Sequence, residues 1–206
     1  MNENRITDMA DILHLGRQSQ NNLAALNQVV TERLKEADYS RVYALFDELL
    51  AIAEETDMKK LAQKEERLDG MSSDLSVLRM ELLKEQELLR ALRDTNDHYT
   101  EVLQGEIDAG NAFVAGVAAP GMTDVITMQE TMKKRVQELV MTRSVGMSFS
   151  EQIKLAEANL TSLSDRIWNV LMHLIPLLRG RLSVEHSRIM VAEIQKVIGA
   201  EPKPVG

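Results

Sequence analysis

The chain has 206 residues, a formal net charge of −8 and no cysteine, and 44% of its residues are apolar although only 3% are aromatic. Without cysteine, it cannot form disulfides, zinc sites built on thiolates or thiol redox centres. The negative charge argues against non-specific nucleic-acid binding, which depends on Lys and Arg neutralising phosphates. The abundance of Leu, Ala, Glu, Lys, Met and Arg is typical of long helices, so we expect an all-α protein.

Residues 1–57 are expected to form N-terminal helices. Apolar residues recur at helical spacing from Ile6 to Leu34 and again from Val42 to Ile52, as in amphipathic helices. Gly16 predicts a weak point within the first segment, because glycine is a poor helix former. Ser40 is a plausible N-cap for the helix that follows.

A seven-residue leucine repeat dominates the middle of the chain, from about 58 to 109. A second apolar series runs three residues behind it, and Asn96 replaces leucine at one position. Such a pattern predicts a long helix whose narrow apolar seam faces another helix. The two series are Leu61, Leu68, Leu75, Leu82, Leu89 and Leu103, and Met71, Leu78, Leu92 and Tyr99.

Residues 110–123 interrupt this pattern with three glycines and Pro120, which predicts the tip of a hairpin. Its apolar segment Phe113–Val117 could serve packing or docking. A second apolar stripe then runs from 124 to 178, which predicts a helix of similar length. Two such helices joined by a short tip should pack antiparallel. Pro176 should kink or end the second helix, and Gly180 should stop it.

The chain should close with a short C-terminal helix, 179–199, capped by Ser183, and a disordered tail, 200–206. The predicted fold is therefore an elongated antiparallel helical hairpin, coiled-coil-like, with the N-terminal helices and the short C-terminal helix packed at one end. The longest apolar run, 167–178, is too short to span a bilayer. The start of the chain lacks the apolar core of a secretory signal, so we expect a cytoplasmic protein.

One polar series is a candidate functional surface. Gln152, Asn159 and Arg166 recur every seven residues at the edge of the second stripe, where side chains should be half-buried and able to reach a neighbouring helix. They could fix the register of the helices, as a polar seam residue does in coiled coils. Alternatively, they could recognise a partner helix or an anion.

Two basic clusters could be solvated helix flanks or anion sites. The first cluster is Lys133, Lys134, Arg135 and Arg143, and the second is Arg179, Arg181 and Arg188. We expect no catalytic residues, metal or cofactor. The four histidines, His14, His98, His173 and His186, are not spaced to share one helix face, and no phosphate-binding loop or nucleophile motif occurs. The sequence therefore predicts a protein that is not an enzyme.

A family resemblance adds to this interpretation. The segments that carry it are Arg135–Leu139, Thr142–Val145, Gln152–Leu155, Asn159 and Ile175–Leu177. Through them the chain resembles the toxic-anion-resistance (tellurite-resistance) family over much of its length, which implies a cytoplasmic protein of stress resistance. Tellurite is a thiol-reactive oxyanion, and reducing it would need cysteines or a redox cofactor, so binding to another protein is the expected mode of action.

The leading hypothesis is therefore a non-enzymatic scaffold or adaptor that acts through helix–helix contacts, with Arg143, Gln152, Asn159 and Arg166 as its surface. One alternative is a peripheral membrane or envelope-associated factor that uses the tip or the basic C-terminal end. Another is a direct oxyanion binder that uses Lys133, Lys134, Arg135 and Arg143. The apolar seam could also close between two chains, so a homo-oligomer stays open.

Overall fold

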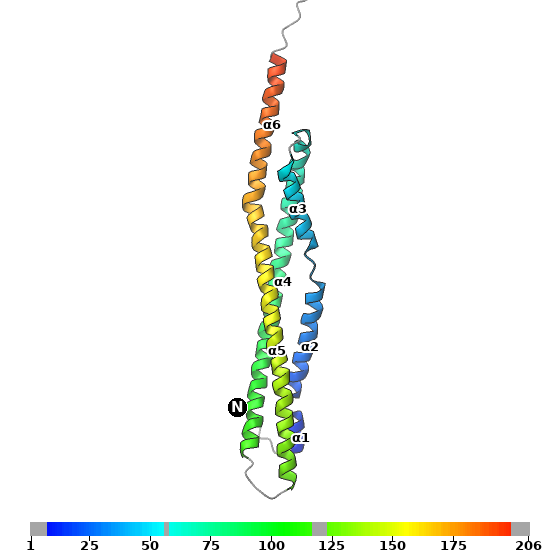
Figure 1. Ribbon diagram of the computed structural model, residues 1–206, viewed down its shortest axis with the longest axis vertical. Helices are drawn as coiled ribbons and strands as arrows, with labels where there is room; N and C mark the ends of the chain where they lie inside the picture. The colour runs from blue at the N-terminus through cyan, green and yellow to red at the C-terminus, as the bar shows by residue number, and fades with distance from the viewer. Residues whose placement is uncertain (1–7, 56–57, 117–122, 199–206) are drawn as a thin grey trace, which may run out of the picture. The chain divides into compact units, whose positions relative to one another are not determined.

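The computed structural model describes residues 8–55, 58–116 and 123–198. Nearly all of these residues are helical, and no strand occurs among them, which confirms the all-α prediction (Figure 1). The helices are α1 (Met9–His14), α2 (Arg17–Glu36), α3 (Ser40–Glu54), α4 (Met58–Gly116), α5 (Thr123–Asn169) and α6 (Ile175–Ile198), with a π-helical turn, η1 (Val170–Leu174), between the last two.

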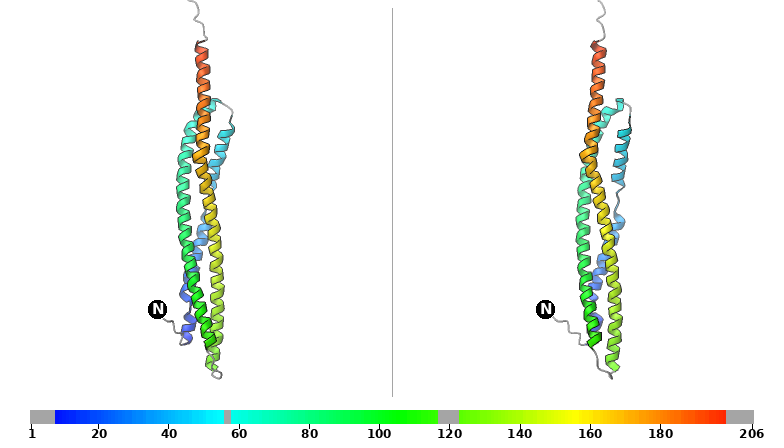
Figure 2. Two further views of the ribbon diagram at one scale, coloured as in Figure 1. Left: turned by 90° about the vertical axis from the view of Figure 1, so that its left-hand side faces the viewer. Right: turned by 60° about the vertical axis from the view of Figure 1, so that its left-hand side comes forward.

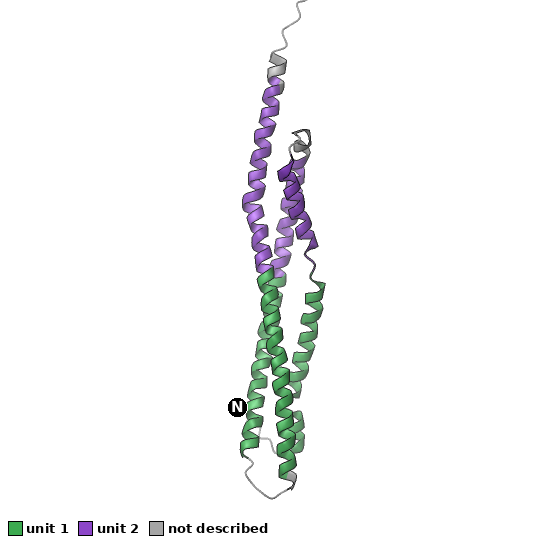
Figure 3. Cartoon of the chain, in the orientation of Figure 1, with its two compact units in different colours: residues 1–37, 85–159 green, residues 38–84, 160–206 purple. Residues whose placement is uncertain are grey.

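The chain divides into two compact units, which Figure 3 colours separately. Unit 1 comprises residues 1–37 and 85–159, and unit 2 comprises residues 38–84 and 160–206. The long helices α4 and α5 therefore contribute residues to both units. Each unit is described by itself below.

Unit 1 is built on the predicted hairpin. Asn96 of α4 donates a hydrogen bond to Gly146 O of α5, and Ser150 of α5 donates one to Asp97 of α4. Further along the pair, Arg93 contacts Glu157. An earlier residue of α4 thus contacts a later residue of α5, so the two helices run antiparallel, as predicted.

Helices α1 and α2 complete the core of unit 1 (Figure 2). Arg33 of α2 donates two hydrogen bonds to Glu85 of α4, at 2.7 and 2.9 Å. Apolar side chains of all four helices of unit 1 point inward, because burying them removes their surface from water. The buried cluster is Ile12, Leu15, Leu23, Leu103, Ile107, Met132, Val136 and Leu139.

Gly16 separates α1 from α2, which confirms the predicted weak point. It has a φ of 69°, a left-handed conformation that glycine adopts at little cost. A Cβ at this position would lie 2.5 Å from Leu139 Cδ2. Glycine is therefore required here both by the backbone and by the close approach of α5.

Unit 2 combines α3, the first half of α4, the end of α5, η1 and α6. Arg67 of α4 forms two hydrogen bonds with Glu48 of α3, at 2.5 and 2.7 Å. Arg181 of α6 donates to Ala53 O at the end of α3, at 2.6 Å. The buried apolar residues that hold the unit together are Val42, Leu45, Leu49, Ile52, Leu68, Met71, Leu75, Leu78, Leu82, Leu160, Leu163, Ile167, Ile175, Leu178 and Leu182.

The leucine repeat is buried where the structure describes its side chains. Leu68, Leu75, Leu82, Leu89 and Leu103 are each at most 7% exposed, and Asn96 is fully buried among them. The side chain of Leu61 lies outside the described residues. The seven-residue period was therefore a correct guide to the seam of α4.

Three predicted helix boundaries are wrong, namely the helix ends at Gly110 and Gly180 and the helix start at Ser183. Helix α4 continues through Gly110 to Gly116, and α6 continues through Gly180 and Ser183 to Ile198. A glycine inside a helix costs only about 1 kcal/mol. Packing outweighs this cost, because Val136 and Met132 contact α4 at Gly110, while Leu178 and Leu182 are buried on either side of Gly180.

Pro176 produces a π-helical turn instead of a helix end. Proline has no N–H to donate and its ring clashes with the carbonyl one turn earlier. The structure places η1 directly before it, with Ile175 N–H donating to Val170 O. The predicted separate C-terminal helix, 179–199, is therefore the continuation of α6.

Two predictions about loops and caps need comment. Ser40 is the first residue of α3 and not its N-cap, because the Asp38 carboxylate accepts its N–H at 2.9 Å. Of the predicted tip, residues 110–116 are helical, and Phe113 and Val114 pack against the core of unit 1. This supports the packing interpretation for these two side chains. Residues 117–122 and the predicted tail, 200–206, lie outside the described residues.

None of the helices, over the residues described, is both long and apolar enough to span a membrane.

Candidate functional site

A groove of about 730 Å³ lies between α4 and α5 within unit 1. It combines acidic, basic, hydroxyl and thioether side chains, and its walls belong to the antiparallel pair described above. The lining residues are Asp94, Asp97, His98, Thr100, Glu101 and Gln104 from α4, and Arg143, Met147, Ser148, Ser150, Glu151 and Lys154 from α5.

Hydrogen bonds at the base of the groove hold its walls in place. Ser150 Oγ donates to Asp97 Oδ1 at 2.7 Å, and Thr100 Oγ1 donates to Asp97 O at 2.7 Å. Next to them in sequence, Asn96 Nδ2 donates to Gly146 O at 2.8 Å, and the Asn96 side chain is fully buried. The groove is therefore preformed, since these bonds hold its two walls, α4 and α5, together in the folded protein.

An ion pair below one end of the groove adds to this rigidity. Arg93 Nη1 contacts Glu157 Oε2 at 2.5 Å, with side chains that are only 22% and 10% exposed. Removing one partner of a largely buried ion pair is strongly destabilising, because the other charge is then left buried without compensation. The pair fixes the lateral position of α4 against α5.

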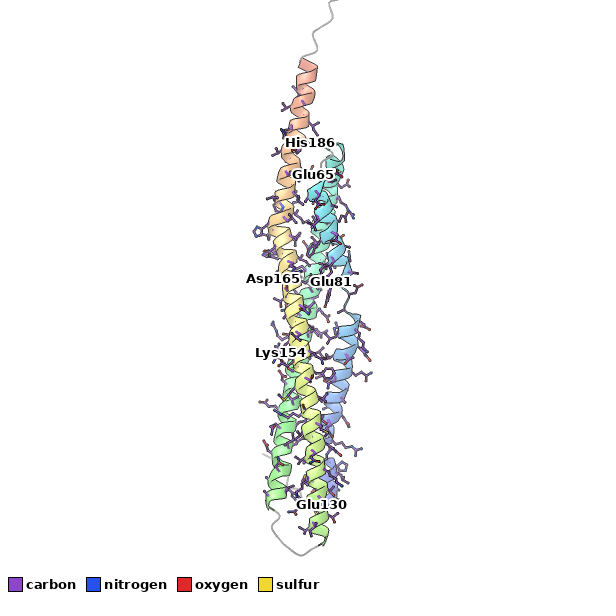
Figure 4. The ribbon with its side chains drawn as sticks, in the orientation of Figure 1. Glu65, Glu81, Glu130, Lys154, Asp165 and His186 are labelled. Atoms are coloured by element: carbon purple, nitrogen blue, oxygen red, sulfur yellow. The ribbon has the colours of Figure 1, made fainter. Side chains whose placement is uncertain are left out.

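The rim of the groove is acidic. Its four carboxylates, Asp94, Asp97, Glu101 and Glu151, outnumber the cations Arg143 and Lys154, which leaves a formal charge of −2 with His98 neutral. Lys154, labelled in Figure 4, pairs with Glu151 at 2.7 Å. The hydrogen bond from Lys154 to Glu151 raises the pKa of Lys154 above its ordinary value.

Arg143 is the one predicted surface residue that lines the groove. Its side chain is half-buried, and its Nε is buried with no hydrogen-bond acceptor. Because this N–H is closed to solvent, a carbonyl or an anion in the groove would meet Arg143 through the rest of its guanidinium. The prediction that Arg143 belongs to a recognition surface stays consistent with this position.

The other three residues of the predicted surface do not have the predicted burial. Gln152, Asn159 and Arg166 are exposed, not half-buried. The positions one residue later, Ile153, Leu160 and Ile167, are the ones that are buried. One residue turns an α-helix by about 100°, so the polar series lies beyond the edge of the seam. Arg166 also belongs to unit 2, whereas the other two belong to unit 1.

The residues of the predicted basic cluster differ in how far their side chains are buried. Lys133 and Lys134 are exposed, but the Arg135 side chain is only 11% exposed. Arg135 Nε donates to Leu15 O, at the C-cap of α1, and its Nη1 donates to Glu138, both at 2.8 Å. Arg135 therefore anchors α1 to α5, which limits its use in anion binding.

Glu106 makes a buried polar contact that was not predicted from the sequence. Ser19 Oγ donates to Glu106 Oε1 at 3.3 Å, while Glu106 Oε2 is buried without a partner. Burial raises the pKa of Glu106, although the Ser19 hydrogen bond and the Arg135 charge oppose this. The signal was present in the sequence, since Glu106 lies three residues after Leu103 and so at the edge of the seam.

Replacing Glu106 with glutamine should stabilise the protein at neutral pH. The raised pKa means that the folded state disfavours the carboxylate, so the contribution of Glu106 to stability falls as pH rises through the ordinary titration range of glutamate, about 4 to 5. Urea unfolding at a series of pH values checks this. The difference between Glu106→Gln and the parent should vanish at pH 3 and favour the variant at pH 7. Equal stability at both pH values would contradict the assignment.

No group of three or more His, Asp or Glu side chains lies close enough to hold a metal ion in the part of the chain that the structure describes. The groove instead offers ion pairs, hydrogen bonds and apolar contact along two helices. Comparison of the chain with family models, with curated proteins and with solved structures finds no match. The resemblance to toxic-anion-resistance proteins stays a prediction from sequence.

Proposed function

We propose that this protein is a non-enzymatic, cytoplasmic helical adaptor that binds a partner protein in the groove between α4 and α5. The groove carries this proposal, because it is preformed, open and lined by two helices. A role in stress resistance rests only on the sequence resemblance to the toxic-anion-resistance family.

The dimensions of the groove suit a helical segment. Its α4 wall extends from Asp94 to Gln104, which corresponds to about 15 Å at 1.5 Å per residue. This length matches about three turns of a docked amphipathic helix, a common mode of peptide recognition. Met147, which is 49% exposed in the wall, provides the adaptable apolar contact that methionine offers at such surfaces.

Charge indicates the chemistry of the partner. The formal charge of −2 in the groove favours a segment that carries Lys or Arg, and the chain as a whole is also acidic, at −8. The same charges oppose binding to anionic lipid, which weakens the peripheral-membrane alternative. Phe113 and Val114, part of the segment proposed to touch lipid, are packed against the core of unit 1.

Capture of partners from the native host tests the proposal. A tagged protein with Glu101→Lys and Met147→Glu should lose its partner at least about tenfold, since a loss of 1.4 kcal/mol changes affinity by that factor. Both substituted side chains are exposed, so circular dichroism should show an unchanged helical content. The matched control is Gln152→Ala with Asn159→Ala, on an exposed part of α5 outside the groove.

The control separates two surfaces. If the partner is retained by the groove variant but lost by the Gln152/Asn159 variant, the surface predicted from sequence is the correct one and the groove proposal is wrong. Growth of a strain lacking the protein on tellurite tests the stress role separately. Unchanged survival would remove the resistance part of the proposal and leave the adaptor part.

Direct oxyanion binding is the second candidate, and the position of the Arg143 guanidinium in the wall of the groove favours it. It predicts saturable, salt-sensitive binding of tellurite that is lost in Arg143→Ala. The four carboxylates around Arg143 count against it, because they repel an anion. Isothermal titration with tellurite decides between the two candidates, and absence of heat would remove the oxyanion candidate.

A further inference from the structure

Helix α6 presents an apolar face that none of the described side chains of unit 2 covers. Its buried side chains are Ile175, Leu178 and Leu182. Beyond Leu182, none of the described side chains of α6 is buried. Figures 1 and 2 show that this part of α6 extends past the other helices of unit 2.

The exposed face consists of apolar and small residues. Val184, Met190, Val191 and Ile194 are between 50% and 61% exposed. Positions three and four residues apart lie on the same side of a helix, so these residues share a face with Gly180, Ser183 and Ser187. None of these seven residues is charged. Exposed contiguous apolar surface of this kind marks an interaction site.

The face also contains a hollow of about 510 Å³, bordered by Ser183, Val184, Ser187, Arg188, Val191 and Ala192. Its lining combines small residues, Ser183, Ser187 and Ala192, with the larger apolar Val184 and Val191. Arg188 lies on the rim, where its guanidinium contacts Glu185 at 3.5 Å. The face thus combines large apolar side chains with small residues on a single helix.

We propose that α6 pairs with α6 of a second copy of this chain, antiparallel, about a twofold axis beside Ser187. In this register, Val191 faces Ser183 of the partner subunit, and Ile194 faces Gly180 of the partner subunit. Val191 and Ile194 therefore each meet a small residue, while Met190 meets the apolar side chain of Val184 of the partner subunit. A twofold interface requires this self-complementarity, because each contact occurs twice with the roles exchanged.

A second copy fits this face better than a charged partner. The seven residues of the face carry no charge that would select an acidic or a basic partner or repel a second copy, and Arg188 at the border of the hollow is paired with Glu185. A single pair of helices buries less than the roughly 800 Å² per partner of a standard stable interface. The dimer should therefore dissociate on dilution. This inference is independent of the groove in unit 1, which belongs to a different surface.

Sedimentation equilibrium tests the proposal. The weight-average mass should rise from 23.2 kDa toward twice that value with concentration. Val191→Glu should hold the mass at that of the monomer over the same range. The matched control is Leu155→Glu on α5, which replaces an exposed leucine, 68% exposed, outside this face. A parent protein that stays monomeric, or a Val191→Glu variant that still dimerises, would overturn the proposal.

Cross-linking tests the orientation, and the absence of native cysteine makes it specific. Ser183→Cys mixed with Val191→Cys should form a mixed disulfide under mild oxidation, and each variant alone should form at least tenfold less. The Ser187→Cys variant should cross-link with itself, since Ser187 lies beside the axis. Self-cross-linking of Ser183→Cys without the mixed product would indicate parallel helices and overturn the antiparallel pairing.

Discussion

Replacing Gly146 with valine should lower the free energy of unfolding by about 2 to 3 kcal/mol, the cost of overpacking a well-packed core. A Cβ at Gly146 would lie 2.5 Å from Thr100 Cγ2 on α4 and 2.8 Å from Leu23 Cδ2 on α2. The site is therefore closed by two neighbouring helices at once. Because Asn96 also binds the carbonyl of Gly146, displacement of α5 would break that hydrogen bond as well. Urea unfolding followed by circular dichroism measures the loss.

Gly105 provides the matched control for this experiment. It also lies inside a helix of unit 1, but nothing lies within 4 Å of a Cβ built there. Replacing it with alanine should raise the free energy of unfolding by about 0.5 to 1 kcal/mol, because glycine inside a helix loses more backbone entropy on folding. If Gly146→Val were as stable as the parent, α2 could not approach α5 as closely as the structure shows.

These two glycines illustrate what the sequence could predict. The seven-residue period identified the seam of α4, and the second stripe identified its antiparallel partner, because burial of regularly spaced apolar residues imposes this geometry. The role of a glycine depends instead on which side chain approaches it. Val136 approaches Gly110, and Leu23 approaches Gly146. Both neighbours are distant in sequence, so their approach could not be predicted, and Gly110 was wrongly predicted to end a helix.

The same reasoning explains the partial success at the candidate site. Arg143, one of the four predicted surface residues, lines the groove between α4 and α5. Gln152 and Asn159 lie one residue before buried positions, and a stripe read from spacing alone does not fix helix rotation to within one residue. The acidic wall from Asp94 to Glu101 carried no distinctive motif, since carboxylates at helical spacing are common on solvated helices.

Replacing Asn96 with aspartate should be the most damaging conservative change in unit 1. Asn96 is fully buried, and its Nδ2 donates to Gly146 O at 2.8 Å. An ionised aspartate would have no donor for this carbonyl and would place an unpaired charge inside the seam. The expected loss at pH 7 is about 3 to 5 kcal/mol, the usual cost of an uncompensated buried charge.

The pH dependence of this variant identifies the cause. Burial should raise the pKa of the new carboxyl in the folded state, so the loss should appear as pH rises through about 3.9, the ordinary value for aspartate. Below that pH, the protonated acid can donate to Gly146 O, and the difference from the parent should shrink. Urea unfolding between pH 3 and pH 7 measures this trend.

Two controls make the result interpretable. Asn159→Asp introduces the same charge at an exposed position of α5, so it should change stability by less than about 0.5 kcal/mol. Asn96→Leu completes the leucine repeat and should be nearly neutral at every pH, because removing a buried polar group in favour of an apolar one restores packing. If Asn96→Leu is also less specific in its helix pairing, the single buried asparagine fixes the register of α4 against α5. If Asn96→Asp instead has the same free energy of unfolding as Asn159→Asp, water reaches the seam beside Asn96. The groove would then extend further between α4 and α5 than its lining residues indicate.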